Sequence, residues 1–221
     1  MVTTNYQERV FLAQAGYTKT LLSNYDALIG FNARFLWKCA RPRLLKFYNK
    51  NISANHLEVG VGSGYYLDKC RFPVDKPRIV LLDLNPNSLE FTSARIRRYQ
   101  PTICQGSVLE PISLEANQFD SIGFNYVLHC LPGTLAQKAA TAFENLKPLL
   151  KEGGILFGST VLGEGVKHNY LGKRVMKNYN SRGIFNNYQD KVSDLEAVLK
   201  PNFSTYSVQV IGCTALFTAR K

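Results

Sequence analysis

The sequence predicts an α/β fold in which a doubly wound, largely parallel sheet follows a helical N-terminal segment. Three observations lead to this prediction. From residue 55 onward, short apolar runs alternate with stretches of helical periodicity. The first of these runs ends in a glycine-rich turn, and residues 203–219 hold two strand-like runs without room for a helix between them. Alternating strands and helices imply right-handed crossovers and a parallel sheet that is covered on both faces.

The chain has 221 residues, 45% of them hydrophobic, and fits one compact unit. Residues 1–50 are expected to form a helical N-terminal cap, because apolar and aromatic side chains such as Leu28, Phe31 and Phe35 recur at spacings of three and four. Residues 51–221 form the main domain. No stretch contains the roughly 20 apolar residues that span a bilayer. We therefore expect a cytoplasmic protein without membrane insertion.

The cysteines are few and scattered. There is no CxxC pair and no Cys/His cluster, which predicts neither a disulfide framework nor a metal site and favours a reducing compartment. The five residues are Cys39, Cys70, Cys104, Cys130 and Cys213.

The elements of the main domain follow one another in a regular order. The clearest helix covers residues 87–99, where Asn85 or Asn87 can act as N-cap and Pro86 occupies a tolerated early position. A second helix covers residues 134–150, between two glycine-containing breaks. The predicted strands are residues 56–59, 79–84, 102–104, 119–124 and 155–157, with an antiparallel edge pair about Gly212.

Three alternating glycines, Gly60, Gly62 and Gly64, follow the first strand. Ligands of an α/β sheet bind at the carboxyl ends of its strands, where glycine permits a tight turn and a close approach of the backbone to the ligand. The second strand ends in Asp83, whose carboxylate can accept hydrogen bonds from both hydroxyls of a ribose. The pattern predicts a cofactor that contains a nucleoside.

The glycine pattern distinguishes between cofactors. A dinucleotide fingerprint reads G-x-G-x-x-G, whereas this turn reads G-x-G-x-G behind the acidic Glu58. It resembles motif I of the class I S-adenosylmethionine-dependent methyltransferases. The resemblance extends over residues 55–160, through Asp83, FDSIGFNYVLH and LKPLLKEGGILFGST. It implies a Rossmann-like seven-stranded sheet in the order 3-2-1-4-5-7-6 with an antiparallel last strand, and S-adenosyl-L-methionine as the cofactor.

The resemblance also implies which residues hold the cofactor. Glu58 would hold the methionine amino group, and Asp83 would bind the ribose hydroxyls. The three glycines would pass beneath the methionine and the ribose. A structural alternative exists for each: an ordinary turn for a glycine, a surface charge for Glu58, and a helix cap for Asp83. Burial in an apolar strand makes an unpaired carboxylate costly, which favours a binding role for Glu58.

The adenine end departs from the family pattern. The family often places an Asp after the third strand to bond the adenine amino group, and this chain has Ser107 at that position. We expect Leu84 to cover one face of the adenine, with Ser107 and Val108 as its neighbours.

The exit of the fourth strand offers the candidates for catalysis, because it lies beside the cofactor sulfur in this family. His129 is the leading candidate for a general base, since a neutral imidazole accepts a proton near neutral pH. Tyr126 is the second candidate, and Asn125 is placed with the cofactor residues. The alternatives are a packing role for His129 and core packing for Tyr126. Asn125-Tyr126 is also similar to the N-P-P-Y signature of amine methyltransferases, but both prolines are missing.

The net charge of +11 lies in the two flanks of the chain. Residues 1–57 carry 8 basic and 2 acidic side chains, residues 161–221 carry 9 and 4, and residues 58–160 carry 10 of each. In this family the N-terminal helices and the insertion after the fifth strand, here residues 161–200, usually roof the acceptor site. An anionic or aromatic small molecule is therefore the leading acceptor. An RNA methyltransferase that uses the basic flanks, a protein methyltransferase and a non-catalytic relative are the alternatives, and the oligomeric state stays open.

Overall fold

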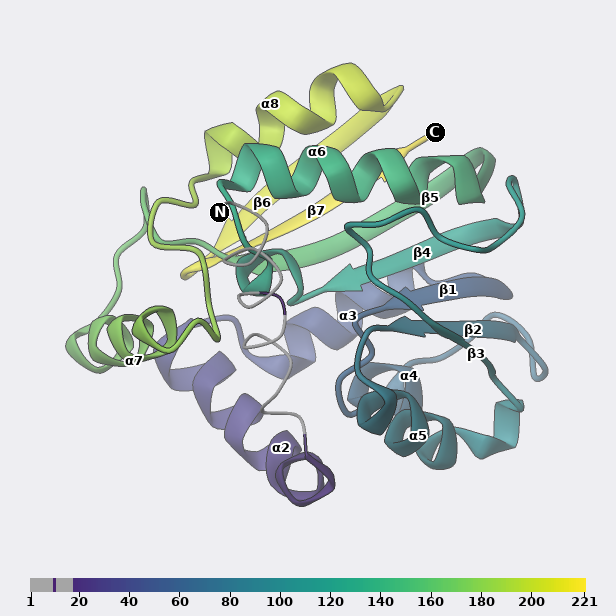
Figure 1. Cartoon of the computed structure of the whole chain (residues 1–221), viewed down its shortest axis with the longest axis horizontal. Helices are drawn as coiled ribbons and strands as arrows, with labels where there is room; N and C mark the ends of the chain where they lie inside the picture. The colour runs from purple at the N-terminus through teal and green to yellow at the C-terminus, as the bar shows by residue number, and fades with distance from the viewer. Residues whose placement is uncertain (1–9, 11–17) are drawn as a thin grey trace, which may run out of the picture.

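The computed structural model describes residue 10 and residues 18–221, and its central feature is a seven-stranded sheet with helices on both faces (Figure 1). The strand order is β3-β2-β1-β4-β5-β7-β6. β7 is antiparallel to both of its neighbours, and the other pairings are parallel. The predicted α/β fold and its strand order are confirmed. The predicted edge pair about Gly212 is confirmed as well.

The strands agree closely with the apolar runs of the sequence. They are β1 (Asn55–Val59), β2 (Arg78–Asp83), β3 (Thr102–Gln105), β4 (Phe119–Asn125), β5 (Leu150–Val161), β6 (Thr205–Ile211) and β7 (Thr214–Arg220). β5 is longer than the predicted residues 155–157. Residues 151–153 near its start are exposed, so the apolar pattern marks only part of the buried stretch that follows them. The pairing register with β4 shifts at that point.

The helices begin where local capping signals place them. The side chain of Asn85 accepts a hydrogen bond from the Asn87 backbone N–H at the start of α5, and Thr134 forms a capping box with Gln137 at the start of α6. The α-helices are α2 (Lys19–Phe31), α3 (Arg41–Asn51), α4 (Tyr65–Lys69), α5 (Pro86–Arg95), α6 (Leu135–Leu146), α7 (Tyr170–Ser181) and α8 (Val192–Asn202). Short turns of 3-10 helix are η2 (Arg97–Tyr99), η3 (Leu128–Cys130) and η4 (Lys147–Leu149), and η1 (Asn32–Leu36) is a π-helix. In the described part of the chain, no helix is long and apolar enough to cross a membrane.

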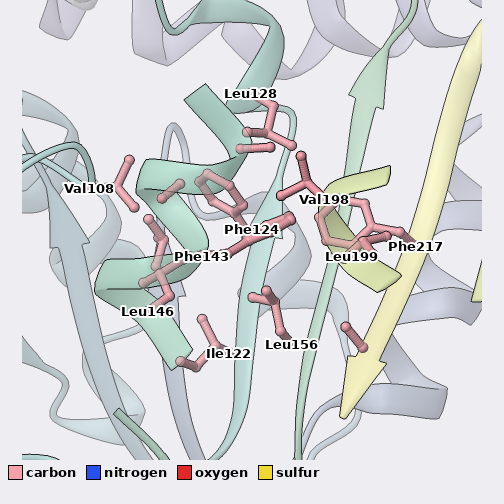
Figure 2. Packing of buried hydrophobic residues seen from close by; sticks show 14 of the residues in the cluster. Val108, Ile122, Phe124, Leu128, Phe143, Leu146, Leu156, Val198, Leu199 and Phe217 are labelled. Atoms are coloured by element: carbon pink, nitrogen blue, oxygen red, sulfur yellow. The ribbon is translucent and has the colours of Figure 1, made fainter. Parts of the chain in front are cut away.

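The sheet separates two hydrophobic cores. α6 and α8 cover one face, where Phe124, Phe143, Leu199 and Phe217 interlock (Figure 2). α3, α4 and α5 cover the other face, with Leu44 and Tyr48 of α3 fully buried (Figure 1). Burial of a large apolar side chain stabilises the fold by roughly 1.5–3 kcal/mol. The two cores therefore fix the strand ends at which a ligand can bind.

The helical segment that precedes β1 is joined to the far edge of the sheet. The backbone N–H of Cys213 donates to the carbonyl of Trp37 at 2.7 Å. Gly212 allows this approach, because a Cβ atom there would lie 2.3 Å from the Trp37 carbonyl oxygen and its φ is +60°. α7 contacts η1, whereas α8 packs on α6 and β6. In the segment that follows β5, α7 therefore lies beside the N-terminal cap, and α8 covers the sheet.

Candidate functional site

A cavity of about 180 Å³ opens at the carboxyl ends of β1, β2 and β4. Ten of the eleven site residues that the sequence predicts line this cavity, and His129 is the exception. The ten are Glu58, Gly60, Gly62, Gly64, Asp83, Leu84, Ser107, Val108, Asn125 and Tyr126. The sheet therefore gathers residues from four separate stretches of sequence into one site, as expected for strand ends at the crossover point of a doubly wound fold.

The glycine turn after β1 depends on the absence of side chains. Gly60 has a φ of +68°, and a Cβ atom there would lie 2.3 Å from Cγ2 of Val127. Gly64 has a φ of +69°, and a Cβ atom there would lie 2.6 Å from Cγ2 of Thr92. Both conformations are left-handed, which glycine adopts without steric cost. The turn forms a cradle whose backbone lies open to the cavity.

Asp83 lies at the end of β2, and burial raises the pKa of its carboxyl group. Backbone N–H groups partly offset this rise, including that of Asn85, which donates to Oδ1 at 2.8 Å. Asn85 caps α5 with its own side chain. The cap position is thus filled by another residue, which leaves the carboxylate of Asp83 at the cavity wall.

Glu58 is buried inside β1 and held by two side chains. Its Oε1 accepts a hydrogen bond from the hydroxyl of Tyr48, and its Oε2 lies 2.9 Å from Nε2 of His56. His56 is fully buried, and its Nδ1 lies 2.8 Å from Oγ of Ser121. Gly123 on β4 provides the space, because a Cβ atom there would lie 2.3 Å from Oε2 of Glu58. A carboxylate has about four acceptor positions, so two remain for a ligand.

Ser107 and Val108 lie after β3, where they line the cavity with Leu84. The Ser107 Oγ accepts a hydrogen bond from the backbone N–H of Leu109 at 3.2 Å, and Asn145 donates to the carbonyl of Val108 at 2.9 Å. These contacts fix the backbone of the turn and place an apolar side chain and a hydroxyl at this end of the site.

Asn125 and Tyr126 lie at the end of β4. The Asn125 Oδ1 accepts a hydrogen bond from Ser159 at 3.2 Å. Tyr126 has a φ of +58°, an uncommon value for a non-glycine residue, and its backbone N–H donates to the carbonyl of Ser159 at 2.7 Å. Burial raises the pKa of Tyr126 well above its ordinary value. Its hydroxyl therefore holds its proton at neutral pH.

His129 does not line the cavity and is buried between η3 and the residues that follow α7. Its ring makes an edge contact with Phe185 at 4.3 Å between centroids, and the backbone N–H of Val161 donates to its Nδ1 at 3.4 Å. Burial and the nearby charge of Lys138 lower the pKa of His129 to about 3. The imidazole is neutral across the physiological range, and its one ring contact with a residue of the cavity wall is an edge contact with Tyr126 at 5.8 Å between centroids.

The sequence pattern does not single out several side chains that complete the wall. They come from α3 and α4 and include Arg41, Tyr48, Tyr65 and Tyr66. The guanidinium of Arg41 stacks on the ring of Tyr65 at 4.0 Å. Arg41 and Tyr48 belong to the cap, whose mixture of basic and aromatic residues cannot select one residue among many, and Tyr65 and Tyr66 directly follow Gly64 of the glycine turn.

Comparison with known proteins decides the family. Residues 57–156 match the family model described as a methyltransferase domain. The chain is 40% identical to demethylluteothin O-methyltransferase of Streptomyces thioluteus over 96% of its own length and 92% of that protein. The chain belongs to the S-adenosylmethionine-dependent methyltransferases.

Further relatives of this methyltransferase agree. It is 36% identical to the physcion biosynthesis cluster O-methyltransferase of Aspergillus chevalieri over 93% of each chain. Its fold matches DhpI in complex with S-adenosylhomocysteine, with a TM-score of 0.66, 17% identity, and coverage of 94% of this chain and 95% of that one. The protein is a methyltransferase enzyme that acts on a small molecule and uses S-adenosylmethionine.

The residues of the methyltransferase cavity fit this cofactor. The glycine cradle, whose positions a Cβ atom would fill, leaves room for a ligand against the backbone. Two carboxylates, Glu58 and Asp83, offer acceptors for an ammonium group and for ribose hydroxyls. Within residue 10 and residues 18–221, no group of three or more His, Cys, Asp or Glu side chains is placed to hold a metal ion.

Proposed function

We propose that this methyltransferase transfers a methyl group to a hydroxyl oxygen of a small, planar or anionic acceptor. The observation that carries the proposal is the 40% identity to an O-methyltransferase over nearly the whole of both chains. An N-methyltransferase, vrtF of Penicillium aethiopicum, is 30% identical over 84% of this chain. Methylation of an amine is therefore the second candidate, with weaker support.

The proposed cofactor residues are those on the cavity wall. Glu58 binds the ammonium of the methionine portion, and the Tyr48 hydroxyl and the His56 ring hold its carboxylate in position. Asp83 binds the ribose hydroxyls. Leu84, Ser107 and Val108 surround the adenine.

The proposed chemistry relies on positioning. When bound, the cofactor supplies a methyl group on a positively charged sulfur. The acceptor oxygen forms the new bond to carbon as the bond from sulfur to carbon breaks, and the hydroxyl proton leaves to solvent. Two titratable side chains that follow β4, Cys130 and Tyr126, hold their protons at neutral pH. Burial raises the pKa of Cys130 to about 12 and that of Tyr126 well above its ordinary value. Alignment of two reactants can contribute roughly 7–11 kcal/mol to a rate enhancement.

Under this proposal His129 packs against its neighbours and does not act as the general base. It does not line the cavity, and it contacts Phe185, the backbone of Val161 and the ring edge of Tyr126. The proposal expects a His129→Gln variant to keep methyl transfer. A loss of transfer in a folded variant would restore His129 as the base.

The test uses methyl-tritiated S-adenosylmethionine with three groups of acceptors: phenols and enols with and without a carboxylate, the matching amines, and total RNA. Label in an extractable methyl ether of a hydroxylated compound is the expected result. Label found only in amines, or lost on nuclease treatment, would overturn the proposal.

Matched variants show whether the label comes from this site. Asp83→Asn should lose transfer, whereas Asp75→Asn, which changes an exposed carboxylate outside the cavity, should retain it.

A further inference from the structure

A group of large apolar side chains is exposed on the helical cap and at the start of α7. We call this group the apolar surface, and its members are Leu28, Phe31, Phe35, Tyr170 and Leu171. Phe31 and Phe35 are 50% and 51% exposed, and Tyr170 is 80% exposed. Single exposed apolar residues are common, but a contiguous group of them marks a site of contact with another molecule.

The apolar surface extends over two segments that lie next to each other. Phe31 ends α2 and Phe35 lies in η1, with their ring centroids 4.9 Å apart. The side chain of Asn169, the N-cap of α7, donates to the carbonyl of Phe35 at 2.8 Å. This hydrogen bond joins η1 to the helix start that carries Tyr170 and Leu171, and Figure 1 shows α7 beside the cap. The two segments therefore present one surface.

The charged side chains around the apolar surface are positive. Arg34, Lys173, Arg174 and Lys177 are exposed, and within the described part of the chain none of the four belongs to an ion pair. Neither η1 nor α7 contains an acidic residue. Tyr170, Arg174 and Lys177 are spaced by four and three residues along α7, so they share one face of the helix. Apolar side chains and cations are thus combined on one side of the protein.

This combination fits an anionic lipid surface better than it fits another macromolecule. Helices that lie on membranes combine Lys and Arg with Phe and Leu, and anionic lipids attract basic residues near the bilayer. Protein interfaces are usually depleted in lysine. RNA phosphates would pair with the cations but would leave the aliphatic side chains of Leu28 and Leu171 without a partner. None of the described helices is able to span a membrane, so the contact is with the bilayer surface.

The apolar surface lies next to the methyltransferase cavity. Ile29 lines the cavity, whereas its neighbour Leu28 is exposed and belongs to the apolar surface. Consecutive residues of a helix point about 100° apart, so α2 presents one side to the cavity and another to the outside. A bilayer that contacts the apolar surface is therefore separated from the cavity by little more than this helix.

We infer that the apolar surface and its four cations dock the protein on an anionic lipid bilayer, with the rings of Phe31 and Phe35 in the headgroup region. The inference goes beyond the proposed function and does not depend on which acceptor atom is methylated. Docking holds the cavity close to a phase in which apolar acceptors concentrate. It is reversible and weakens with added salt, because salt screens the attraction of the cations.

Sedimentation with sucrose-loaded vesicles tests the apolar part of the inference. One set of vesicles contains phosphatidylglycerol and phosphatidylcholine in equal parts, and the other contains phosphatidylcholine alone. The variant Phe31→Ser with Phe35→Ser removes the two rings. Its matched control is Tyr206→Ser with Val210→Ser, which removes two exposed apolar side chains from β6.

The same vesicles test the cations. The variant Lys173→Gln with Lys177→Gln removes two charges one helical turn apart. Its matched control is Lys46→Gln with Lys50→Gln, which removes two exposed charges at the same spacing on α3. Both variants have the same net charge, so a difference between them reports the position of the charges. The affinity for S-adenosylhomocysteine, measured by isothermal titration, checks that each variant is folded.

We expect the wild-type protein to bind the anionic vesicles and to bind the neutral vesicles only weakly. Each charge removed from α7 should weaken binding roughly fivefold, equivalent to about 1 kcal/mol, so the Lys173→Gln, Lys177→Gln variant should lose roughly 25-fold. The Phe31→Ser, Phe35→Ser variant should lose roughly tenfold or more, because it removes apolar area from the contact. Both controls should stay within about twofold of wild type, since charges farther from the bilayer than a Debye length are screened.

Four results would overturn the inference. Equal losses in the two lysine variants would show that net charge alone attracts the protein, and unchanged binding of the phenylalanine variant would remove the apolar surface from the contact. Tighter binding to total RNA than to vesicles, lost in the Lys173→Gln, Lys177→Gln variant, would assign the cations to RNA. Absence of wild-type binding to anionic vesicles, with a dimer in sedimentation velocity that Phe31→Ser with Phe35→Ser dissociates, would assign the apolar surface to a second copy of the chain.

Discussion

Glu58 shows how a single charged residue can be placed inside a buried strand. The carboxylate is stabilised by Tyr48 and His56, and it has space only because Gly123 lies opposite it on β4. The hydrogen bonds offset a cost of burial that an unpaired charge would impose. A site residue therefore requires three supporting residues from two other stretches of sequence and from its own strand.

His129 gives a prediction at the same scale. Because its pKa falls from 6.5 to about 3 in the folded protein, the unfolded chain takes up a proton below pH 6.5 that the folded protein does not. The free energy of unfolding should decrease as the pH falls from 6.5 toward 3, by up to about 1.4 kcal/mol per pH unit from this residue. Urea unfolding of wild type and His129→Gln between pH 4 and 8 measures how the free energy of unfolding depends on pH.

The difference between the two unfolding curves isolates His129, because Asp190 and His168 titrate in both proteins. We expect the variant to lose less stability than wild type on acidification. Curves that stay parallel from pH 8 to pH 4 would show that His129 is protonated equally in both states.

At the scale of elements, a buried ion pair fastens the α7–α8 connection to α6. The Nζ of Lys138 lies 2.8 Å from Oδ2 of Asp190 and donates to the carbonyl of Asn186 at 2.6 Å. The two side chains are 0% and 3% exposed. The connection also carries Phe185, which contacts His129 and Trp37. Position along the chain alone does not reveal this link between a helix and a loop about fifty residues apart.

Lys138→Met should destabilise the protein by about 3–5 kcal/mol at pH 8, because it leaves the Asp190 carboxylate buried without its partner. Burial already raises the pKa of Asp190 to about 6, and removal of the lysine raises it further. The unfolded carboxyl ionises at its ordinary pKa, so the loss should grow as the pH rises and should be smaller at pH 5. Urea unfolding at both pH values checks this expectation.

Lys151→Met is the matched control, because Lys151 pairs with Asp120 at a half-exposed site. Its loss should stay within about 1 kcal/mol. The double variant Lys138→Met with Asp190→Leu should regain stability. Equal losses at positions 138 and 151, or a loss independent of pH, would contradict a buried pair.

For the whole molecule, the cavity lies between the strand ends of the sheet and the residues of α3 and α4. Asp26 adds a link from α2, since it bonds Ser63 in the glycine turn and Arg95 on α5. A ligand that fills the cavity would contact both the sheet and the cap, because residues of both line it. Its binding energy is then available to stabilise the folded chain as a unit.

S-adenosylhomocysteine at 100 times its Kd should add about 2.7 kcal/mol to the free energy of unfolding. In a domain of this size that corresponds to a rise in Tm of roughly 5–11 °C. Differential scanning fluorimetry of wild type and Asp83→Asn measures the shift. The variant should show little shift at the same concentration, and an equal rise in both proteins would indicate binding outside the proposed site.

The strand order follows from the family resemblance. The sequence by itself determined which segments form strands, where α5 and α6 start and where the glycine turn lies. Each depends on a local signal, since apolar periodicity, an N-cap such as Thr134 and alternating glycines act within a few residues. The resemblance then placed ten residues on what proves to be one cavity wall. Strand ends meet at one edge of a parallel sheet, so residues at strand ends can be grouped without knowing any side-chain direction.

Only the tertiary structure decided which other side chains join the site. His129 follows a strand end as the other candidates do, yet its ring packs on Phe185 and does not line the cavity. Arg41, Tyr48 and Tyr66 come from helices α3 and α4. Arg41 packs on Tyr65, and Tyr48 stacks on Tyr66. The direction of a side chain and the approach of distant helices depend on long-range contacts, which periodicity within one segment does not encode.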